Sequence, residues 1–79
     1  MVDLDGKAVI ITGASSGIGA ALAIQFSQRG ARLTLAARRL DRLQEVAGKC
    51  PGEVFPIATD LTRETDRGRI VQKTLGKWG

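Results

Sequence analysis

A glycine-rich segment, ITGASSGIG at residues 11–19, directly follows an apolar run, AVII at residues 8–11. It joins an expected strand over residues 7–12 to an expected helix over 17–29 with almost no side-chain bulk. A strand that ends in glycines and opens a helix aims backbone N–H groups and the positive helix end at one point. We therefore expect a phosphate to be bound there; the alternative is a tight turn without a ligand.

The remaining residues alternate between strand-like and helix-like patterns. Apolar residues over 31–37 and 54–59 predict two further strands, and apolar stripes predict helices from about residue 40 and after Thr62, which can cap the last one. Gly30 is placed to end the first helix, and Pro56 argues that its strand lies at a sheet edge. The stripes expected to face the core are Ile18, Leu22 and Phe26 in the first helix and Ile70, Val71, Leu75 and Trp78 in the third.

This β-α-β-α-β-α order predicts an α/β fold. Right-handed crossovers in one direction give a parallel sheet of strand order 3-2-1, with the first two helices on the same face. This is one half of a three-layer, Rossmann-type, doubly wound sheet. Residues 1–79 are therefore interpreted as a single dinucleotide-binding segment, without a linker or a repeat.

Composition excludes several classes of protein. With 79 residues, 43% hydrophobic and 25% charged, the chain is typical of one small soluble domain. The net charge of +4 comes from scattered Lys and Arg with few aromatic residues, so no nucleic-acid partner is expected. One cysteine and no histidine give neither a disulfide nor a zinc site. No apolar stretch suits a membrane span or a secretory signal, so we expect a cytoplasmic location.

The segment TGASSGIG, from Thr12 to Gly19, resembles the cofactor loop T-G-x-x-x-G-I-G of the short-chain dehydrogenase/reductase (SDR) family. AARR after the second strand and DLT after the third extend the resemblance over the whole chain. The resemblance implies an NAD(P)-dependent oxidoreductase with a Rossmann fold. It further implies that the dinucleotide is lined by Gly13, Gly17 and Gly19. The resemblance assigns the adenosine ribose or its phosphate to Ser15 and Ser16, and the pyrophosphate to the Ile18 amide. It also implies that the adenine contacts Asp60 and Leu61. For Asp60, an ordinary turn or capping role is the alternative.

Charge after the second strand bears on the choice of cofactor. NAD needs a carboxylate there for its ribose hydroxyl, whereas the 2′-phosphate of NADP needs a cation. Ala37 stands in place of the acid, and two arginines follow at a helix start, where the helix dipole disfavours cations. We expect Arg38 to bind the 2′-phosphate with Arg39 in support, so NADP(H) is favoured over NAD. The alternative is two solvated arginines partly offset by Asp41.

The residues of this chain include no candidate for the proton donor that the SDR reaction needs. In the SDR family a tyrosine, helped by a lysine and a serine, protonates the carbonyl substrate, and this chain has no tyrosine. Two classes therefore stay open: the cofactor-binding half of an oxidoreductase acting on a carbonyl or alcohol, or a non-catalytic nucleotide-binding or interaction module. A methyltransferase would want an acid at Ala37. The open edge of the first strand suggests that the chain is a piece of a longer oxidoreductase, a truncated gene product, or part of a self-associated form.

Overall fold

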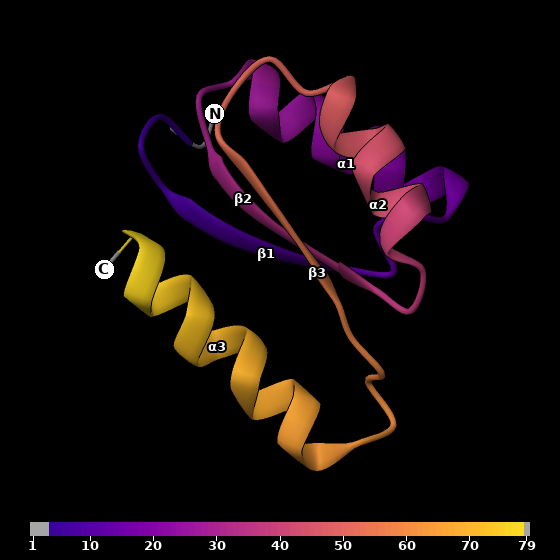
Figure 1. Ribbon diagram of the computed structural model, residues 1–79. Coiled ribbons are helices and arrows are strands. Elements are labelled where there is room, and N and C mark those ends of the chain that lie inside the picture. The colour runs from indigo at the N-terminus through magenta and orange to yellow at the C-terminus, as the bar shows by residue number, and fades with distance from the viewer. Residues whose placement is uncertain (1–3, 79) are drawn as a thin grey trace.

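The computed structural model describes residues 4–78 as three strands and three helices (Figure 1). In chain order the elements are β1 (Ala8–Thr12), α1 (Gly17–Gln28), β2 (Arg32–Ala37), α2 (Leu40–Gly48), β3 (Val54–Ala58) and α3 (Glu64–Trp78). The predicted order of elements is confirmed. Gly30 follows α1 with φ +87°, the left-handed conformation expected of a residue that ends a helix.

The strands form one parallel sheet in the order β1-β2-β3, as predicted. In the register, Thr12 pairs with Ala36 and Ala37 pairs with Ala58, so the three strands end close together. Helices α1 and α2 cover one face of the sheet and α3 covers the other, which gives three layers (Figure 1). The loops that follow the three strands therefore gather at one end of the sheet.

The central strand β2 carries the core. Leu33 and Leu35 are fully buried beneath α1 and α2, together with Leu43 of α2. On the other face, the buried hydroxyls of Thr34 and Thr74 lie 2.8 Å apart, and Thr74 also donates to the Ile70 carbonyl at 2.7 Å. A polar pair thus joins α3 to the middle of the sheet, because the buried Thr34 hydroxyl finds its partner on that helix.

The face that α1 turns to the core differs from the predicted one. The helix buries Gly19, Ala23 and Ser27, whereas Ile18 is 80% exposed and Leu22 is 40% exposed. The third predicted position, Phe26, is half-buried and packs against the core as expected. A Cβ atom on Gly19 would collide with the carbonyl oxygen of the residue that follows β1. The first turn of the helix therefore approaches the loop after β1 so closely that no side chain fits at position 19.

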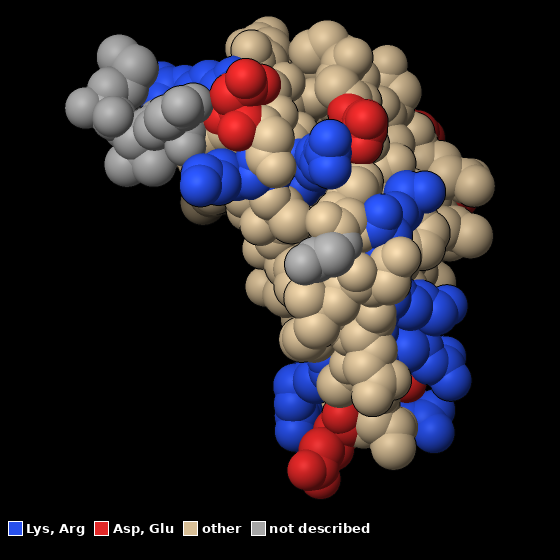
Figure 2. Space-filling view, turned by 90° about the vertical axis from the view of Figure 1, so that its left-hand side faces the viewer, with Lys and Arg blue, Asp and Glu red and all other residues tan. Residues whose placement is uncertain are grey.

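Helix α3 also buries a narrower face than predicted. Ile70 and Thr74 are buried, but Val71 and Leu75 are 50% and 58% exposed. Trp78 is half-buried, and its indole N–H donates to Glu53 at 3.0 Å. Figure 2 shows uncharged surface in the lower half of the molecule, with Lys and Arg side chains on both sides of it and Asp or Glu side chains at its lower end. Within residues 4–78, no helix is both long and apolar enough to cross a bilayer.

Candidate functional site

The glycine-rich loop makes a tight turn between β1 and α1. Gly13 has φ +64°, a conformation that L side chains rarely adopt. Its carbonyl accepts hydrogen bonds from the Ser16 amide at 3.1 Å and from the Ser16 hydroxyl at 2.8 Å. The Ser16 hydroxyl in turn accepts from the Gly19 amide at 3.2 Å. Ser16 is therefore the N-cap of α1, and the loop is rigid before any ligand arrives.

The first turn of α1 presents unpaired donors to solvent. The backbone amides of Gly17 and Ile18 have no hydrogen-bond partner among residues 4–78, as expected of amides at a helix start. A Cβ atom on Gly17 would meet nothing within 4 Å, so the fold itself does not require glycine there. The helix carries no acidic residue in its first turn. This arrangement offers open N–H groups and a positive helix end to an anion.

The two serines of the loop differ in what they can still bind. The hydroxyl hydrogen of Ser16 is committed to the Gly13 carbonyl, so toward a ligand Ser16 can act only as an acceptor. Ser15 is half-buried, and its hydroxyl makes no hydrogen bond within the part of the chain that the structure describes. A phosphate or ribose oxygen could thus receive a hydroxyl hydrogen from Ser15 alone. The capping role of Ser16 was missed, although serine directly before a helix is its usual signal.

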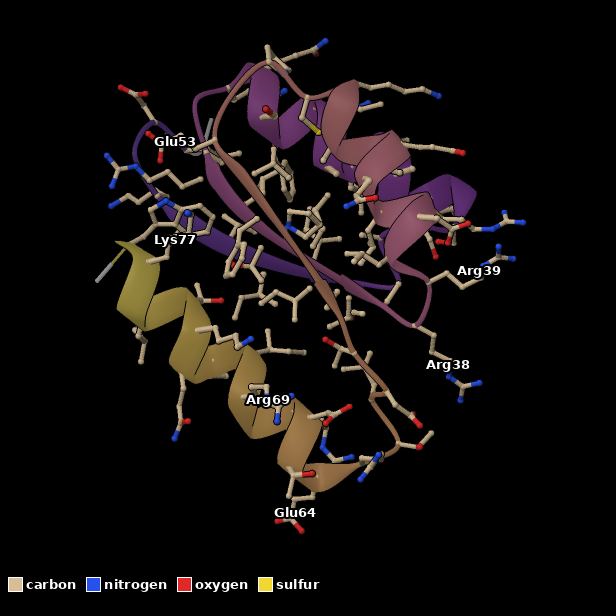
Figure 3. The ribbon with its side chains drawn as sticks, in the orientation of Figure 1. Arg38, Arg39, Glu53, Glu64, Arg69 and Lys77 are labelled. Atoms are coloured by element: carbon tan, nitrogen blue, oxygen red, sulfur yellow. The ribbon has the colours of Figure 1, made fainter. Side chains whose placement is uncertain are left out.

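The two arginines after β2 lie in different environments (Figure 3). Arg39 makes two hydrogen bonds to Asp41, with Nε to Oδ1 at 3.3 Å and Nη2 to Oδ2 at 2.9 Å. The hydrogen bond from Arg39 lowers the pKa of Asp41 below its ordinary value. The Arg38 side chain is 72% exposed, and its Nη2 lies 3.8 Å from Asp60 Oδ1. Asp41 therefore occupies Arg39, and the Arg38 guanidinium stays open to a ligand.

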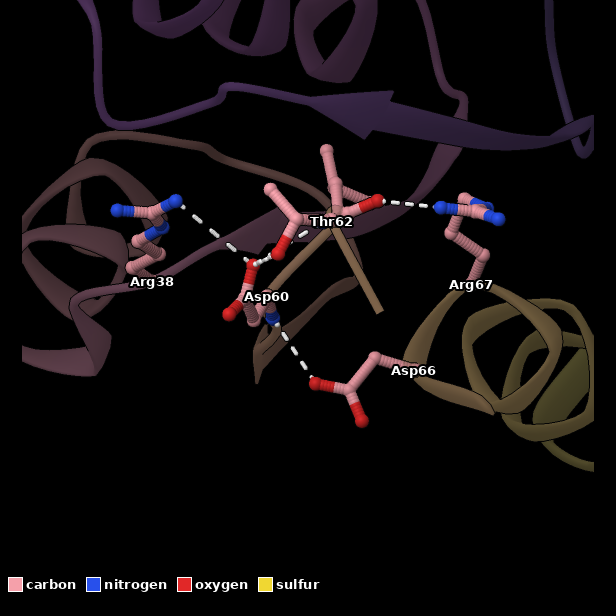
Figure 4. Close-up of polar contacts among 6 residues, drawn as sticks. Arg38, Asp60, Thr62, Asp66 and Arg67 are labelled. Atoms are coloured by element: carbon pink, nitrogen blue, oxygen red, sulfur yellow. Dashed lines mark hydrogen bonds and ion pairs between the residues drawn. The ribbon is translucent and has the colours of Figure 1, made fainter. Parts of the chain in front are cut away.

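Asp60 organises the turn that follows β3 (Figure 4). Its Oδ1 accepts from the Thr62 hydroxyl at 2.6 Å and from the Thr62 amide at 3.0 Å. These bonds, with smaller contributions from Arg38 and Arg63, hold the pKa of Asp60 below its ordinary value. The hydroxyl of Thr62, expected to cap α3, is thus bound to Asp60 instead. The Oδ2 atom of Asp60 has no hydrogen-bond partner in the described chain and can accept from a ligand.

A cavity of about 360 Å³ lies between the ends of β2 and β3, lined by Arg38, Ala58, Thr59 and Asp60. Its volume is within the range of small-molecule sites, about 300–1,000 Å³. The three strand ends thus provide open amides after β1, a cation after β2, and a carboxylate beside a hollow after β3. Of the residues expected at the site, Arg38 and Asp60 are brought directly together. Ligands of parallel α/β sheets bind at this end of the strands.

Comparison with known proteins agrees with this geometry. The family described as short chain dehydrogenase matches residues 7–79. An 11-beta-hydroxysteroid dehydrogenase-like protein (4A) of Arabidopsis thaliana is 48% identical over 80 residues, covering 96% of this chain and 27% of that protein. The chain therefore spans about a quarter of the length of this curated relative.

Solved structures share the fold. A metagenomic short-chain oxidoreductase in complex with NADP superposes with a TM-score of 0.91 at 33% identity, covering 99% of this chain and 37% of that one. A short chain dehydrogenase/reductase from Burkholderia phymatum in complex with NAD has a TM-score of 0.93 at 29% identity, covering 100% of this chain and 29% of that one. The two similar structures thus hold different nicotinamide cofactors, and the choice between them falls to the residues of this chain.

Proposed function

The chain belongs to the short chain dehydrogenase family, and from that premise we propose that it forms the dinucleotide-binding part of an NADP(H)-dependent oxidoreductase. The observation that carries the proposal is that the backbone amides of Gly17 and Ile18 have no partner among the described residues, and that the fold itself does not require glycine at position 17. The dinucleotide pyrophosphate would accept from these amides, and the Gly13 and Gly19 backbone would approach it closely. Ser15 would donate to an adjacent phosphate or ribose oxygen.

The cofactor preference rests on charge at the end of β2. Ala37 offers no carboxylate to the ribose 2′-hydroxyl of NAD, and the Arg38 guanidinium is exposed beside the cavity. A 2′-phosphate would accept a charge-assisted fork of hydrogen bonds from Arg38. Arg39 is engaged by Asp41, so its support would be mainly electrostatic. The adenine would lie in the cavity between Arg38 and Asp60, and NAD would bind less tightly than NADP(H).

The proposed reaction is hydride transfer between the nicotinamide and a carbonyl or alcohol substrate. The bound cofactor would supply the hydride to a carbonyl or accept it from an alcohol, and this chain's residues would bind and orient its adenosine and pyrophosphate portions. The chain contains no tyrosine to act as proton donor. That absence favours the second candidate, a nucleotide-binding module without catalysis of its own, for these 79 residues taken alone.

Isothermal titration of the purified chain with NADPH and NADH tests the proposal. We expect saturable binding of both, with NADPH bound more tightly, and competition by adenosine 2′,5′-bisphosphate. If neither NADPH nor NADH binds to the chain, the proposed dinucleotide site is refuted. Binding without oxidation of NADPH in the presence of carbonyl compounds would favour the non-catalytic module for this chain.

Two further expectations belong with this proposal. Three large apolar side chains are exposed: Ile10 on the edge strand β1, and Val71 and Leu75 on α3. No other described element covers them, so we expect this surface to mediate self-association. The single cysteine, Cys50, is an unpaired thiol and suits a reducing compartment such as the cytoplasm.

A further inference from the structure

The turn after β3 is held from outside by the first turns of α3 (Figure 4). The Oδ2 atom of Asp66 accepts from the backbone amide of Asp60 at 3.0 Å. The Nη1 atom of Arg67 donates to the Leu61 carbonyl at 2.7 Å. Both contacts bridge six residues of sequence, so they join the helix to the turn rather than neighbours within it.

These contacts fix consecutive peptide planes. Asp66 holds the N–H of the 59–60 peptide, the Arg63 amide donates to the carbonyl of the 60–61 peptide at 3.0 Å, and Arg67 holds the carbonyl of the 61–62 peptide. A peptide is planar, so fixing one of its groups fixes the direction of the other. In the 60–61 peptide that other group is the Leu61 N–H, which has no partner among the described residues.

The turn therefore presents an unpaired donor, the Leu61 N–H, close in sequence to an unpaired acceptor, Asp60 Oδ2. Asp66 and Arg67 hold the two peptides on either side of the 60–61 peptide, whose own carbonyl accepts from Arg63. We propose that Asp66 and Arg67 are positioning residues that, by fixing these flanking peptides, keep this donor and acceptor aimed at the heterocyclic base of the dinucleotide. The inference rests on the proposed function, because without a bound dinucleotide the two groups have nothing to recognise. It extends the site to α3, from which no binding residue was expected.

A purely structural role for the Arg67 side chain is not required by the packing. Helix α3 is attached to the sheet farther along, through buried Ile70, the Thr34–Thr74 pair and the Trp78 ring on Phe55. The Arg67 side chain is exposed, and among residues 4–78 its hydrogen bond is to the Leu61 carbonyl alone. Its removal should loosen the turn while the helix stays in place.

The test compares side-chain replacements by titration with adenosine 2′,5′-bisphosphate, which contains the base and the 2′-phosphate but no nicotinamide. We expect Arg67→Met to weaken binding about tenfold, as for loss of one charge-assisted hydrogen bond, with an unchanged urea midpoint of unfolding. Arg67→Lys should recover part of the affinity, because an ammonium also donates. Arg69→Met is the matched control, since the Arg69 side chain lies on the same helix and makes no hydrogen bond or ion pair in the described chain.

Asp66 gives an independent arm. Asp66→Ala removes the acceptor for the Asp60 amide and should weaken binding, whereas Asp66→Asn retains an acceptor oxygen and should bind nearly as tightly as the unsubstituted chain. Equal affinities for Arg67→Met and the unsubstituted chain would overturn the inference alone. A lowered urea midpoint in Arg67→Met would overturn it in favour of a structural role. If the unsubstituted chain binds neither NADPH nor the bisphosphate, the proposed function and this inference both fall.

Discussion

The guanidinium of Arg38 lies 3.8 Å from the carboxylate of Asp60, which places a cation and an anion at the ends of neighbouring strands. The Arg38 side chain is largely exposed, and an exposed pair of this kind contributes only about 0–1 kcal/mol. A phosphate monoester, with about 1.5 to 2 negative charges at neutral pH, can therefore compete with Asp60 for the guanidinium. The ion pair keeps Arg38 near the cavity without closing it.

Replacing Arg38 tests its assignment to the 2′-phosphate. We expect Arg38→Ala to weaken NADPH binding about 10- to 100-fold and to leave NADH binding nearly unchanged, because only NADPH loses a charge-assisted hydrogen bond. Titration calorimetry with both cofactors measures the ratio. Arg39→Ala is the comparison, and its effect should be smaller because Asp41 already holds that guanidinium. An unchanged NADPH-over-NADH preference in Arg38→Ala would show that the assignment is wrong.

Two glycines of the loop should respond differently to alanine. Gly19→Ala should destabilise the fold by about 1–3 kcal/mol, because its Cβ would collide with the Gly13 carbonyl. Gly17→Ala meets open space and should leave the unfolding free energy unchanged or raise it by up to about 1 kcal/mol. It should nevertheless weaken NADPH binding, since the methyl group would stand where the pyrophosphate approaches. Urea unfolding and titration together separate the two effects, and full NADPH affinity in Gly17→Ala would contradict the proposed site.

The buried hydroxyl pair predicts an asymmetry between two valine variants. Thr74→Val leaves the Thr34 hydroxyl buried without a partner and should cost about 1–3 kcal/mol. Thr34→Val should cost less, because Thr74 still donates to the Ile70 carbonyl. The double variant should recover part of the loss, since no hydroxyl then stays buried and unpaired. Urea unfolding of the three variants provides the measurement, and equal costs for both single variants would argue against this hydrogen-bond direction.

Stability in acid should depend on Asp60. Hydrogen bonds from Thr62 lower its pKa in the folded chain below the ordinary value of 3.8. A carboxyl with a depressed folded pKa contributes its full stability above the unfolded pKa and loses that contribution as pH falls through the folded pKa. We therefore expect the unfolding free energy of Asp60→Asn to fall less steeply than that of the unsubstituted chain below about pH 4. Parallel curves from urea unfolding across that range would rule out this role.

Charge on the exposed face of α3 should control self-association. Leu75 is 58% exposed, so Leu75→Glu should leave the fold intact while placing a charge in the apolar surface. We expect sedimentation velocity to detect a concentration-dependent assembly of the unsubstituted chain and to find the variant monomeric. Gln72→Glu, also on the exposed part of α3, adds the same charge and serves as control. If the unsubstituted chain stays monomeric at high concentration, this prediction is wrong.

The order of elements could be predicted because its signals are local. Apolar runs, the glycines at 13 and 30, and Pro51 with Gly52 mark strands, turns and breaks within a few residues of where they act. The buried faces of α1 and α3 could not be predicted in the same way. Apolar spacing favoured Ile18 and Leu22, whereas α1 buries the face that carries Gly19, which closely approaches the loop after β1, and that approach arises only in the folded chain.

Within the candidate site, motif positions indicated which residues gather at the strand ends but not how they are held. The pairing of Arg39 with Asp41 could be weighed from the sequence, because the two residues are neighbours. The contacts from Asp66 and Arg67 back to the turn depend on the angle at which α3 leaves β3. No spacing rule encodes that angle, so the sequence does not indicate these contacts, although Asp66 is recognisable as an acid in the first turn of a helix.

Pro56 makes the two edges of the sheet unequal in their ability to pair with a further strand. In β3 the amides on either side, those of Phe55 and Ile57, point toward β2, as the Thr59 amide does in its 2.7 Å bond to Ala37. The Pro56 nitrogen therefore faces outward and has no hydrogen to offer, which interrupts the outer row of donors at its midpoint. A further strand beside β3 would lack one hydrogen-bond donor at the middle of the pair, whereas β1 offers backbone donors without such a gap. Any further strand of this sheet is therefore expected to pair with β1.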